Sequence, residues 1–324
     1  MRLALALALL APASPLDDGP KVTVEEGTKV TKSFENVLEL ELQTITMEFG
    51  DEEQEIPEES LPEFTIRDDE QIVFTDEYLA VDGGRATKIS RTFDELADSS
   101  TKTVSLPDGE GGEDSQEGES ELTGTTVVFS WDEDEEAYSA AFGEDEDADE
   151  DLLEDLEGDA DYVFMLPGEA VEVGDSWELD ASAFTLISSP SGDLKIDSED
   201  EDDSGEEFSE QFEDNLSGDI EVTLESLEDG VATLTFEGVV DTEIRLERER
   251  PDEAPEDLEL EQGFEFSFDL SGTLLWDVET GIASSFDLEA DVEMNTSTSQ
   301  TMGDQSIRQV QYFEGTYTAT ATFE

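Results

Sequence analysis

The sequence contains no histidine and no cysteine, and only 14 of its 324 residues are basic. Without histidine and cysteine, the chain cannot carry out Ser-His-Asp or Cys-His catalysis, and it cannot bind zinc, iron–sulfur clusters or haem through those residues. It also cannot form disulfides or carry the lipid-bearing cysteine of a bacterial lipoprotein. The side-chain chemistry that remains is mainly that of carboxylates.

The 92 acidic residues give the chain a formal net charge of -78 at pH 7. Repulsion on this scale opposes a compact fold unless ions screen it. The Debye length falls from about 10 Å in 0.1 M salt to about 3 Å in 1 M salt, so a saline environment would mute most of the repulsion. Nucleic acids and anionic headgroups bind through clusters of Lys and Arg, which this chain lacks. The sequence therefore excludes DNA and RNA as partners.

Long apolar runs are also missing, because no segment approaches the roughly 20 apolar residues of a transmembrane helix. The one short run, Leu3 to Ala11, follows Arg2 and ends at Ala11-Pro12-Ala13. A basic residue, an apolar run and a small-x-small site are typical of a secretory signal. We expect residues 1–13 to be removed near Ala13, which predicts a soluble protein exported to the periplasm or the extracellular space.

The C-terminal third has the clearest structural pattern. Apart from Gly272 and Ser284, apolar side chains occupy every second position from Phe264 to Trp276 and again from Ile282 to Met294. A period of two is typical of strands with one buried face, and Gly281 suits the turn between these two. The pattern predicts five long antiparallel strands in a meander between about 217 and 324. Strands of such length favour a curved sheet or partial barrel, so we expect an all-β, mainly antiparallel fold.

The N-terminal half is also rich in strand signals. They lie at 37–49, 63–67, 71–81, 85–93, 125–131 and 137–142.

One short helix is expected near 149–157, because three leucines there share one helical face. It would separate an N-terminal β-rich region, 14–158, from a C-terminal meander domain, 159–324. Acidic stretches at 107–122 and 197–214 are expected to be solvated loops, the second being an insertion in the C-terminal domain.

The apolar face of the long C-terminal strands must be covered by other apolar groups. Its own phenylalanines or a helix can fill it, as inward side chains do in most small barrels. The alternative is a site for a lipid or another hydrophobic ligand on the concave face. The residues that would line this site are Phe264, Phe266, Phe268, Phe286 and Leu288.

Acidic loops supply the oxygen ligands that Ca²⁺ prefers. Asp200, Asp202 and Ser204 stand at positions one, three and five of a loop whose sixth residue is Gly205. Position twelve is Gln211 where the helix-loop-helix calcium motif has a bidentate Glu. A solvated acidic run that binds Ca²⁺ loosely is the simpler interpretation, and we expect no tightly bound cofactor.

A pair of carboxylates can serve a hydrolase as acid and base. Among 92 acidic residues some pair lies at a suitable separation by chance, so composition gives such an enzyme no support. We therefore expect a protein that is not an enzyme, and we assign no catalytic residue.

One segment has a recognisable motif. Leu166-Pro167-Gly168 is followed by Val173-Gly174-Asp175-Ser176-Trp177, and upstream lie Gly84-Arg85 and Arg91-Thr92-Phe93-Asp94-Glu95-Leu96. Between about 70 and 180 the chain resembles uncharacterised secreted bacterial β-rich proteins that share a domain of unknown function. The resemblance implies no catalytic residues.

The physical interpretation of the motif is a turn at Gly174-Asp175 that leads Trp177 into a sheet. Stacking of Trp177 on a ligand is the alternative. At the level of architecture, a one-sided, strongly curved sheet is similar to lipoprotein-carrier-like folds, and such a likeness implies little about function.

These observations favour a non-catalytic exported acidic protein of the cell envelope or extracellular space that binds a hydrophobic ligand or an envelope protein. The alternatives are a surface or matrix protein that responds to divalent cations and, less favoured, a carboxylate-based hydrolase. The sequence leaves the ligand and the oligomeric state open.

Overall fold

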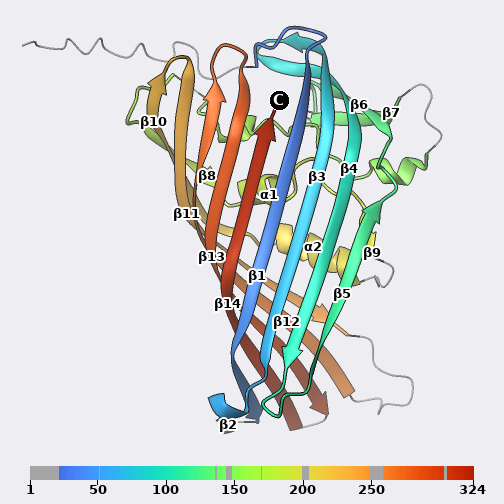
Figure 1. Ribbon diagram of the computed structural model, residues 1–324, viewed down its shortest axis with the longest axis vertical. Coiled ribbons are helices and arrows are strands. Elements are labelled where there is room, and N and C mark those ends of the chain that lie inside the picture. The colour runs from blue at the N-terminus through green and yellow to red at the C-terminus, as the bar shows by residue number, and fades with distance from the viewer. Residues whose placement is uncertain are drawn as a thin grey trace, which may run out of the picture.

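The computed structural model describes residues 22–50, 52–135, 137–143, 148–168, 170–198, 204–248, 258–302 and 305–324. Within them the chain forms one antiparallel sheet of 14 strands, accompanied by a few short helices (Figure 1). The predicted all-β class with a long-stranded curved sheet is confirmed. The expected signal segment, 1–13, lies outside the described residues.

The strands range from short edge pieces to spans of 21 residues. They are β1 Lys29–Phe49, β2 Glu52–Glu55, β3 Glu63–Asp82, β4 Arg85–Ser105, β5 Gly111–Ser120, β6 Thr126–Asp132, β7 Ala137–Phe142, β8 Ser176–Asp180, β9 Ile196–Ser198, β10 Ser217–Glu228, β11 Val231–Glu247, β12 Leu258–Asp277, β13 Ile282–Met302 and β14 Gln305–Phe323. The helices are α1 Ala183–Ser188 and α2 Ser204–Asp214, with 3-10 turns at Glu58–Ser60, Glu150–Leu153 and Val163–Met165.

The five predicted C-terminal strands are present as β10 to β14, and each pairs with the next. Burial along β13 alternates from Phe286 to Met294, as the period of two requires. Gly230 and Gly281 have φ values of +86° and +67° at the first and third hairpin turns. Glycine adopts this left-handed region without a steric penalty, which explains why the turns fall there.

The sheet joins the two ends of the chain. β1 pairs with β14 on one side and with β3 on the other, so the strand order runs β7-β6-β4-β3-β1-β14-β13-β12-β11-β10-β8. The sheet therefore contains strands from both sides of residue 158. At the ends of this path, β7 and β8 each have a single paired neighbour among the described strands.

Three local features differ from the sequence expectations. Residues 111–120, expected as a loop, form β5, whose residues are mostly exposed and include no large apolar side chain, so they lack the apolar alternation of a strand. The expected helix near 149–157 is a 3-10 turn of four residues, Glu150–Leu153. The two α-helices lie further along the chain, and α2 falls within the stretch expected to be an acidic insertion.

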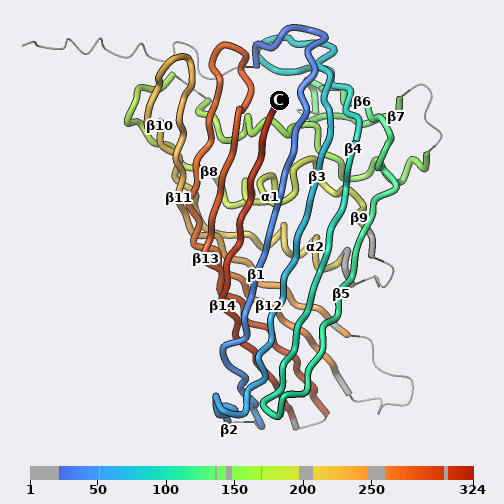
Figure 2. Tube along the Cα trace, viewed as in Figure 1, coloured from blue at the N-terminus to red at the C-terminus, as the bar shows by residue number. Residues whose placement is uncertain are grey.

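The segment between β7 and β10 folds back into the curve of the sheet, where α1 and α2 lie behind β1 and β3 in the view of Figures 1 and 2. Its aromatic side chains enter the core: the ring centroids of Phe184 in α1 and Phe268 in β12 lie 4.8 Å apart. The concave face is therefore covered by the chain itself in this region. Among the described residues, no helix has the length and apolar character needed to cross a bilayer.

Candidate functional site: the concave face of the sheet

The structure places the five predicted ligand-lining residues of β12 and β13 on the concave face. Phe268, Phe286 and Leu288 are buried, whereas Phe264 and Phe266 are half-buried. The alternation of the two strands accounts for this placement, because every second side chain points to the same face.

Different segments cover the buried and the half-buried members of this set. Phe286 stacks between Phe236 and Tyr162, with ring centroids 5.4 Å and 4.3 Å away. Phe264 and Phe266 instead face α2. The ring centroids of Phe208 and Phe264 lie 5.2 Å apart, and those of Phe212 and Phe266 lie 6.1 Å apart. We call Phe208, Phe212, Phe264 and Phe266 the aromatic strip.

Helix α2 is fastened to β11 by polar contacts. The Gln211 side chain donates to the Arg245 carbonyl at 2.9 Å and accepts from the Arg245 amide at 3.0 Å. Asn215 donates to the Glu243 carbonyl at 3.0 Å, and the Thr242 hydroxyl donates to the Phe212 carbonyl at 3.2 Å. The helix is therefore held over the strip by amide groups that satisfy the free backbone of β11.

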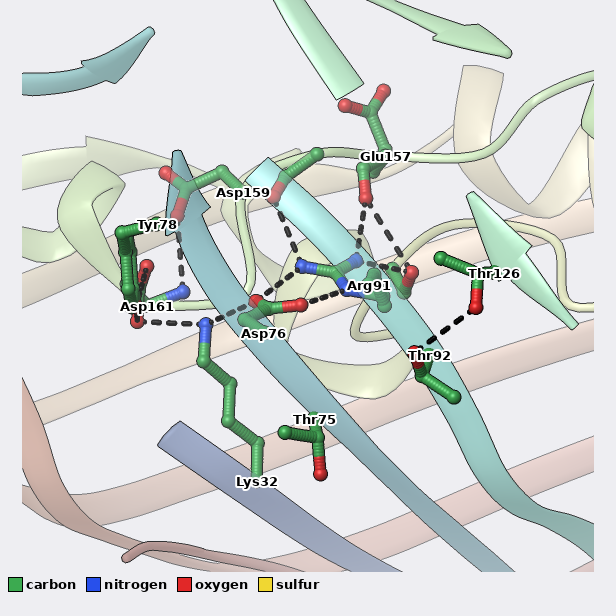
Figure 3. Close-up of polar contacts among 12 residues, drawn as sticks. Lys32, Thr75, Asp76, Tyr78, Arg91, Thr92, Thr126, Glu157, Asp159 and Asp161 are labelled. Carbon is green, nitrogen blue, oxygen red and sulfur yellow. Dashed lines mark hydrogen bonds and ion pairs between the residues drawn. The ribbon is translucent and has the colours of Figure 1, made fainter. Parts of the chain in front are cut away.

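The other half of the concave face, over β1, β3 and β4, encloses a group of charges (Figure 3). Lys32 in β1, Asp76 in β3 and Arg91 in β4 are 0% exposed, and Asp161 is 3% exposed. Asp76 and Arg91 are direct cross-strand partners, and the guanidinium donates twice to the carboxylate, at 2.8 and 2.9 Å. Lys32 Nζ lies 2.7 Å from Asp76 Oδ2 and 2.8 Å from Asp161 Oδ1. We call these four residues the buried ion-pair network.

Arg91 also holds the segment between β7 and β10, which we call the covering segment, against the sheet. Its guanidinium donates to the carbonyls of Glu157 and Gly158, both at 3.0 Å, and to the hydroxyl of Ser191. Ser191 has a φ of 89°, and Tyr162 has a φ of 56°, so neither adopts an ordinary backbone conformation. Such conformations persist where surrounding contacts fix them, and the bonds from Arg91 provide that restraint at Ser191.

The pKa values of Asp76, in the network, and of Tyr78, which bonds to it, are shifted in opposite directions. Burial alone would raise the pKa of Asp76, but the ion pairs with Arg91 and Lys32 outweigh it and hold that pKa below its usual value. Tyr78 donates to the Asp161 carboxylate, whose oxygens lie 2.8 and 2.9 Å away. Burial and then the charge of Asp161 raise the pKa of Tyr78 well above its usual value. Asp76 is therefore ionised and Tyr78 neutral at pH 7.

A cavity of about 40 Å³ adjoins the network and is lined in part by Tyr138, Asp159 and Asp161. It has room for about one water molecule, whose share of liquid volume is about 30 Å³. Burial and the neighbouring Asp161 raise the pKa of Asp159. The neutral form of Asp159 is therefore favoured relative to that of an exposed aspartate.

A further carboxyl, half-buried, lies on β3 beyond the network. Glu70 in β3 accepts a hydrogen bond of 2.6 Å from Asn36, which also donates to the Ser188 carbonyl at the end of α1. Burial, with a smaller contribution from the charge of Asp98, raises the pKa of Glu70 to about 7. The hydroxyl of the nearby Tyr317 has no hydrogen-bond partner among the described residues.

Sequence reasoning missed the buried ion-pair network. The sequence does not distinguish its acidic members from the rest of the 92 acidic residues. The positions of its two cations, in contrast, could have been recognised. Lys32 stands between Val30 and Phe34 at an inward position of β1, and Arg91 stands between Ile89 and Phe93 in β4. A rare basic residue in an apolar alternation indicates a buried cation with a carboxylate partner.

The remaining sequence candidates lie apart from these clusters. Trp177 is half-buried in β8, paired with Val222, and its indole donates to the Met165 carbonyl at 3.1 Å. Asp200 and Asp202 of the expected calcium loop lie outside the described residues, and Ser204 is the first residue of α2. In the part of the chain that the structure describes, no group of three acidic residues is arranged to hold a metal ion.

The outer face of the sheet carries a cluster of acidic side chains. A depression of about 550 Å³ there is lined in part by Asp241, Glu243, Glu265 and Glu293. Glu243 stands directly opposite Glu265 in the register of β11 and β12. Like charges in this position repel each other, and the exposed Arg245 beside them pairs with Glu243.

Comparison with known proteins shows no family for this chain. No protein-family model and no curated protein sequence matches it. Among solved structures it is similar to the InvG secretin domain β-barrel from the Salmonella injectisome, at 8% identity and a TM-score of 0.16, with 92% of this chain and 63% of that chain covered. The chain thus spans less than two thirds of that secretin chain.

The secretin PilQ of the V. cholerae type IV competence pilus gives 8% identity, a TM-score of 0.15, and coverage of 91% of this chain and 60% of that chain. The P. putida toluene transporter TodX gives 10% identity, a TM-score of 0.13, and coverage of 92% and 90%. Similarities of this size carry no argument about function.

Proposed function

We propose that the protein is a non-catalytic, exported, acidic binding protein of the cell envelope or extracellular space, and that it holds an apolar ligand such as a lipid chain between α2 and β12. The observation that carries the proposal is the aromatic strip. Phe264 and Phe266 stay half-buried under a single short helix, whereas the neighbouring Phe268 and Phe286 are sealed in the core.

An apolar ligand can exchange with α2 at low cost. The helix has 11 residues, which is too short to be stable alone, and its fold depends on the surface beneath it. Its contact with β12 is aromatic and non-directional, so a ligand chain can replace the rings of Phe208 and Phe212 with similar burial of apolar surface. The hydrogen bonds of Gln211 and Asn215 to β11 keep the helix attached at one side when a ligand chain enters.

The arrangement of charge supports a non-catalytic role. Lys32, Asp76 and Arg91 form the buried ion-pair network together with Asp161, but they are enclosed by the covering segment, so a substrate has no access to them. Each of the three contacts opposite charge, which is typical of a structural network.

Ligand uptake by the purified mature protein tests the proposal. Native mass spectrometry would show a co-purifying apolar species, and titration with a fluorescent fatty acid would give its affinity. We expect Phe266→Ser to weaken uptake about tenfold or more, because it removes the centre of the strip. Val239→Ser is the matched control, since Val239 is an exposed apolar residue of β11, 45% accessible. Absence of both a co-purifying ligand and uptake by the wild type would refute the proposal.

The outer face favours a second candidate role, that of a surface protein that responds to divalent cations. Asp269 opposes Asp291, and Glu293 opposes Glu314, in addition to the pair of Glu243 and Glu265. Cations that screen these pairs would stabilise the sheet. Titration with Ca²⁺ at fixed ionic strength should then raise the melting temperature, and an unchanged melting temperature argues against this role.

A further inference from the structure

The apolar surface of the concave face extends beyond the aromatic strip. Phe266 lies in the same cross-strand row as Phe313, whose ring centroid is 5.8 Å from that of Phe64 in β3. Leu42, the partner of Phe313 in β1, and Ile66 in β3 are half-buried and pack against the core. An apolar surface therefore runs across the inner side of the sheet from β12 to β3.

The length of this surface matches that of a lipid chain. β12 and β3 are four positions apart in the strand order, which corresponds to about 19 Å along the sheet and to less across its concave side. Half the hydrocarbon core of a bilayer, which one lipid chain spans, is about 15 Å thick. A chain that begins under α2 can therefore end at β3.

The surface ends at β3 in a group of carboxylates. Asp68 and Glu70 follow Ile66 at inward positions, and Glu70 stands directly opposite Asp98 of β4. We call Asp68, Glu70 and Asp98 the carboxylate triplet. Burial and the charge of Asp98 raise the pKa of Glu70, and burial and the charge of Asp68 raise the pKa of Asp98. The three groups therefore repel one another.

A buried hydroxyl adjoins the triplet. Tyr317 in β14 is 8% exposed and lies in the same cross-strand row as Asp68. Burial and the charge of Glu70 raise the pKa of Tyr317, so its hydroxyl stays neutral. This hydroxyl has no hydrogen-bond partner among the described residues. A buried polar group without a partner costs free energy, so a ligand atom that bonds to it is favoured.

The part of the chain that the structure describes supplies no cation to the triplet. The inward-facing Lys32 in β1 and Lys102 in β4 are each four residues from the row of Glu70, which is about 13 Å along a strand. Lys32 already belongs to the buried ion-pair network. The described residues also contain no group of three acidic side chains arranged to hold a metal ion, so the triplet is better suited to an organic cation.

We propose that the ligand held under α2 is a cationic amphiphile, whose amine head lies between Glu70, Asp98 and the hydroxyl of Tyr317. An ammonium group has three donors, one for each of these groups. The chain of the ligand lies on the aromatic strip and on Leu42 and Ile66. The assignment rests on the proposed function and adds the charge of the head group to it. The anionic head of a fatty acid is disfavoured at this position, because the carboxylates repel it.

Three probes that share one chain and differ in the head group test the proposal. They are dodecylamine, dodecanol and dodecanoate, each titrated by calorimetry into the full mature chain at pH 8 and fixed ionic strength. All three should bind, since the chain is the same. Dodecylamine should bind about tenfold more tightly than dodecanol, a difference of about 1.4 kcal/mol, and dodecanoate should bind most weakly.

Variants of the head-group site separate a specific contact from general attraction to an acidic protein. Glu70→Gln keeps the acceptor for Asn36 and should weaken dodecylamine binding about tenfold, while dodecanol changes by less than about twofold. The matched control is Glu35→Gln, because the exposed Glu35 of β1 lies one residue from the partner of Glu70, on the opposite face of the sheet. It removes the same charge and should change dodecylamine binding by less than about twofold.

The hydroxyl and the pH dependence give two further measurements. Tyr317→Phe keeps the ring and should weaken dodecylamine binding about threefold. Glu70 loses its proton as the pH rises through its pKa of about 7, so dodecylamine binding by the wild type should strengthen from pH 6 to pH 8. The same titration of Glu70→Gln should show a smaller change.

The results distinguish failure of this assignment from failure of the proposed function. Equal affinity for the three probes, or equal weakening of dodecylamine by Glu70→Gln and Glu35→Gln, would overturn the cationic head group and leave the apolar site in place. Absence of binding by all three probes would refute the apolar site itself.

Discussion

The two halves of the concave face are filled by opposite chemistry. Over β3 and β4 the covering segment is held by Arg91, which bonds to two of its carbonyls and belongs to a fully buried set of charges. Over β11 and β12 the covering helix rests on half-buried aromatic rings. Bonds to a buried charge fix the first cover on the sheet beneath it, whereas α2 is bonded to the backbone of β11 and contacts β12 through aromatic rings. The contrast distinguishes a half whose contacts specify the fold from a half in which a ligand can exchange with the covering helix.

The largest effect should come from breaking the buried ion-pair network. Arg91→Met leaves Asp76 with one cation and frees the carbonyls of Glu157 and Gly158, which should lower the free energy of unfolding by about 3–5 kcal/mol. Urea denaturation measures this loss. Arg91→Met combined with Asp76→Leu keeps Lys32 paired with Asp161, so the double variant should recover part of it. A loss below about 1 kcal/mol for the single variant would contradict the structural role of the network.

The next largest effect on stability should come from Glu70, and this effect depends on pH. Its pKa is raised from 4.5 to about 7 in the folded protein, so the folded state holds a proton that the unfolded state releases. The contribution of Glu70 to stability is therefore present below about pH 4.5, falls as pH rises to about 7, and is level above that.

Glu70→Gln keeps the acceptor for Asn36 without the charge, so it should be more stable than the wild type at pH 8 by about 2 kcal/mol and similar to it at pH 4.5. Melting temperatures from pH 4.5 to pH 8 would show the divergence. A constant difference across this range would indicate that Glu70 does not titrate there.

The aromatic strip should tolerate truncation better than the sealed core. Phe208→Ala should cost about 1–2 kcal/mol, because the ring is only half-buried, whereas Phe286→Ala should cost about 3–5 kcal/mol. Hydrogen exchange in α2 should accelerate in the first variant while β3 and β4 stay protected. If Phe208→Ala also accelerated hydrogen exchange in β4, the two halves of the concave face would unfold as a single cooperative unit.

The smallest effect concerns charges that the fold leaves in solvent. Asp291→Asn removes the repulsion with Asp269 across the strands and should stabilise the protein by about 0.5 kcal/mol in 0.1 M NaCl. In 1 M NaCl the gain should vanish, because exposed charges are screened, whereas the deficit of Arg91→Met should persist. Equal salt dependence of the two variants would remove the distinction between enclosed and solvated charges.

Alternation in the sequence predicted the five strands from 217 to 324, because each has one apolar face and their turns carry residues such as Gly281. It missed β5, since that strand pairs through its backbone and its side chains remain in solvent. The ranges 63–67 and 71–81 merged into one strand, β3, because the polar residues between them also lie in the sheet.

The cover of the concave face was harder to predict. Phe208 and Phe212 are four residues apart, a spacing that places both on one helical face, but they stand in a stretch dominated by acidic residues. The partners of Arg91 come from Glu157, Gly158 and Ser191, far away in the chain, and only tertiary structure brings them together.

The pairing of β1 with β14 has a consequence for biogenesis. Lys32 lies opposite Phe323, so the central contact of the sheet joins residues from nearly opposite ends of the chain. Contacts of such high sequence separation form slowly, whereas the hairpins of β12 with β13 and of β13 with β14 need only local encounters. The pairing of β1 with β14 can form only after β14 has left the ribosome, later than the pairings of β1 with β3 and of β3 with β4.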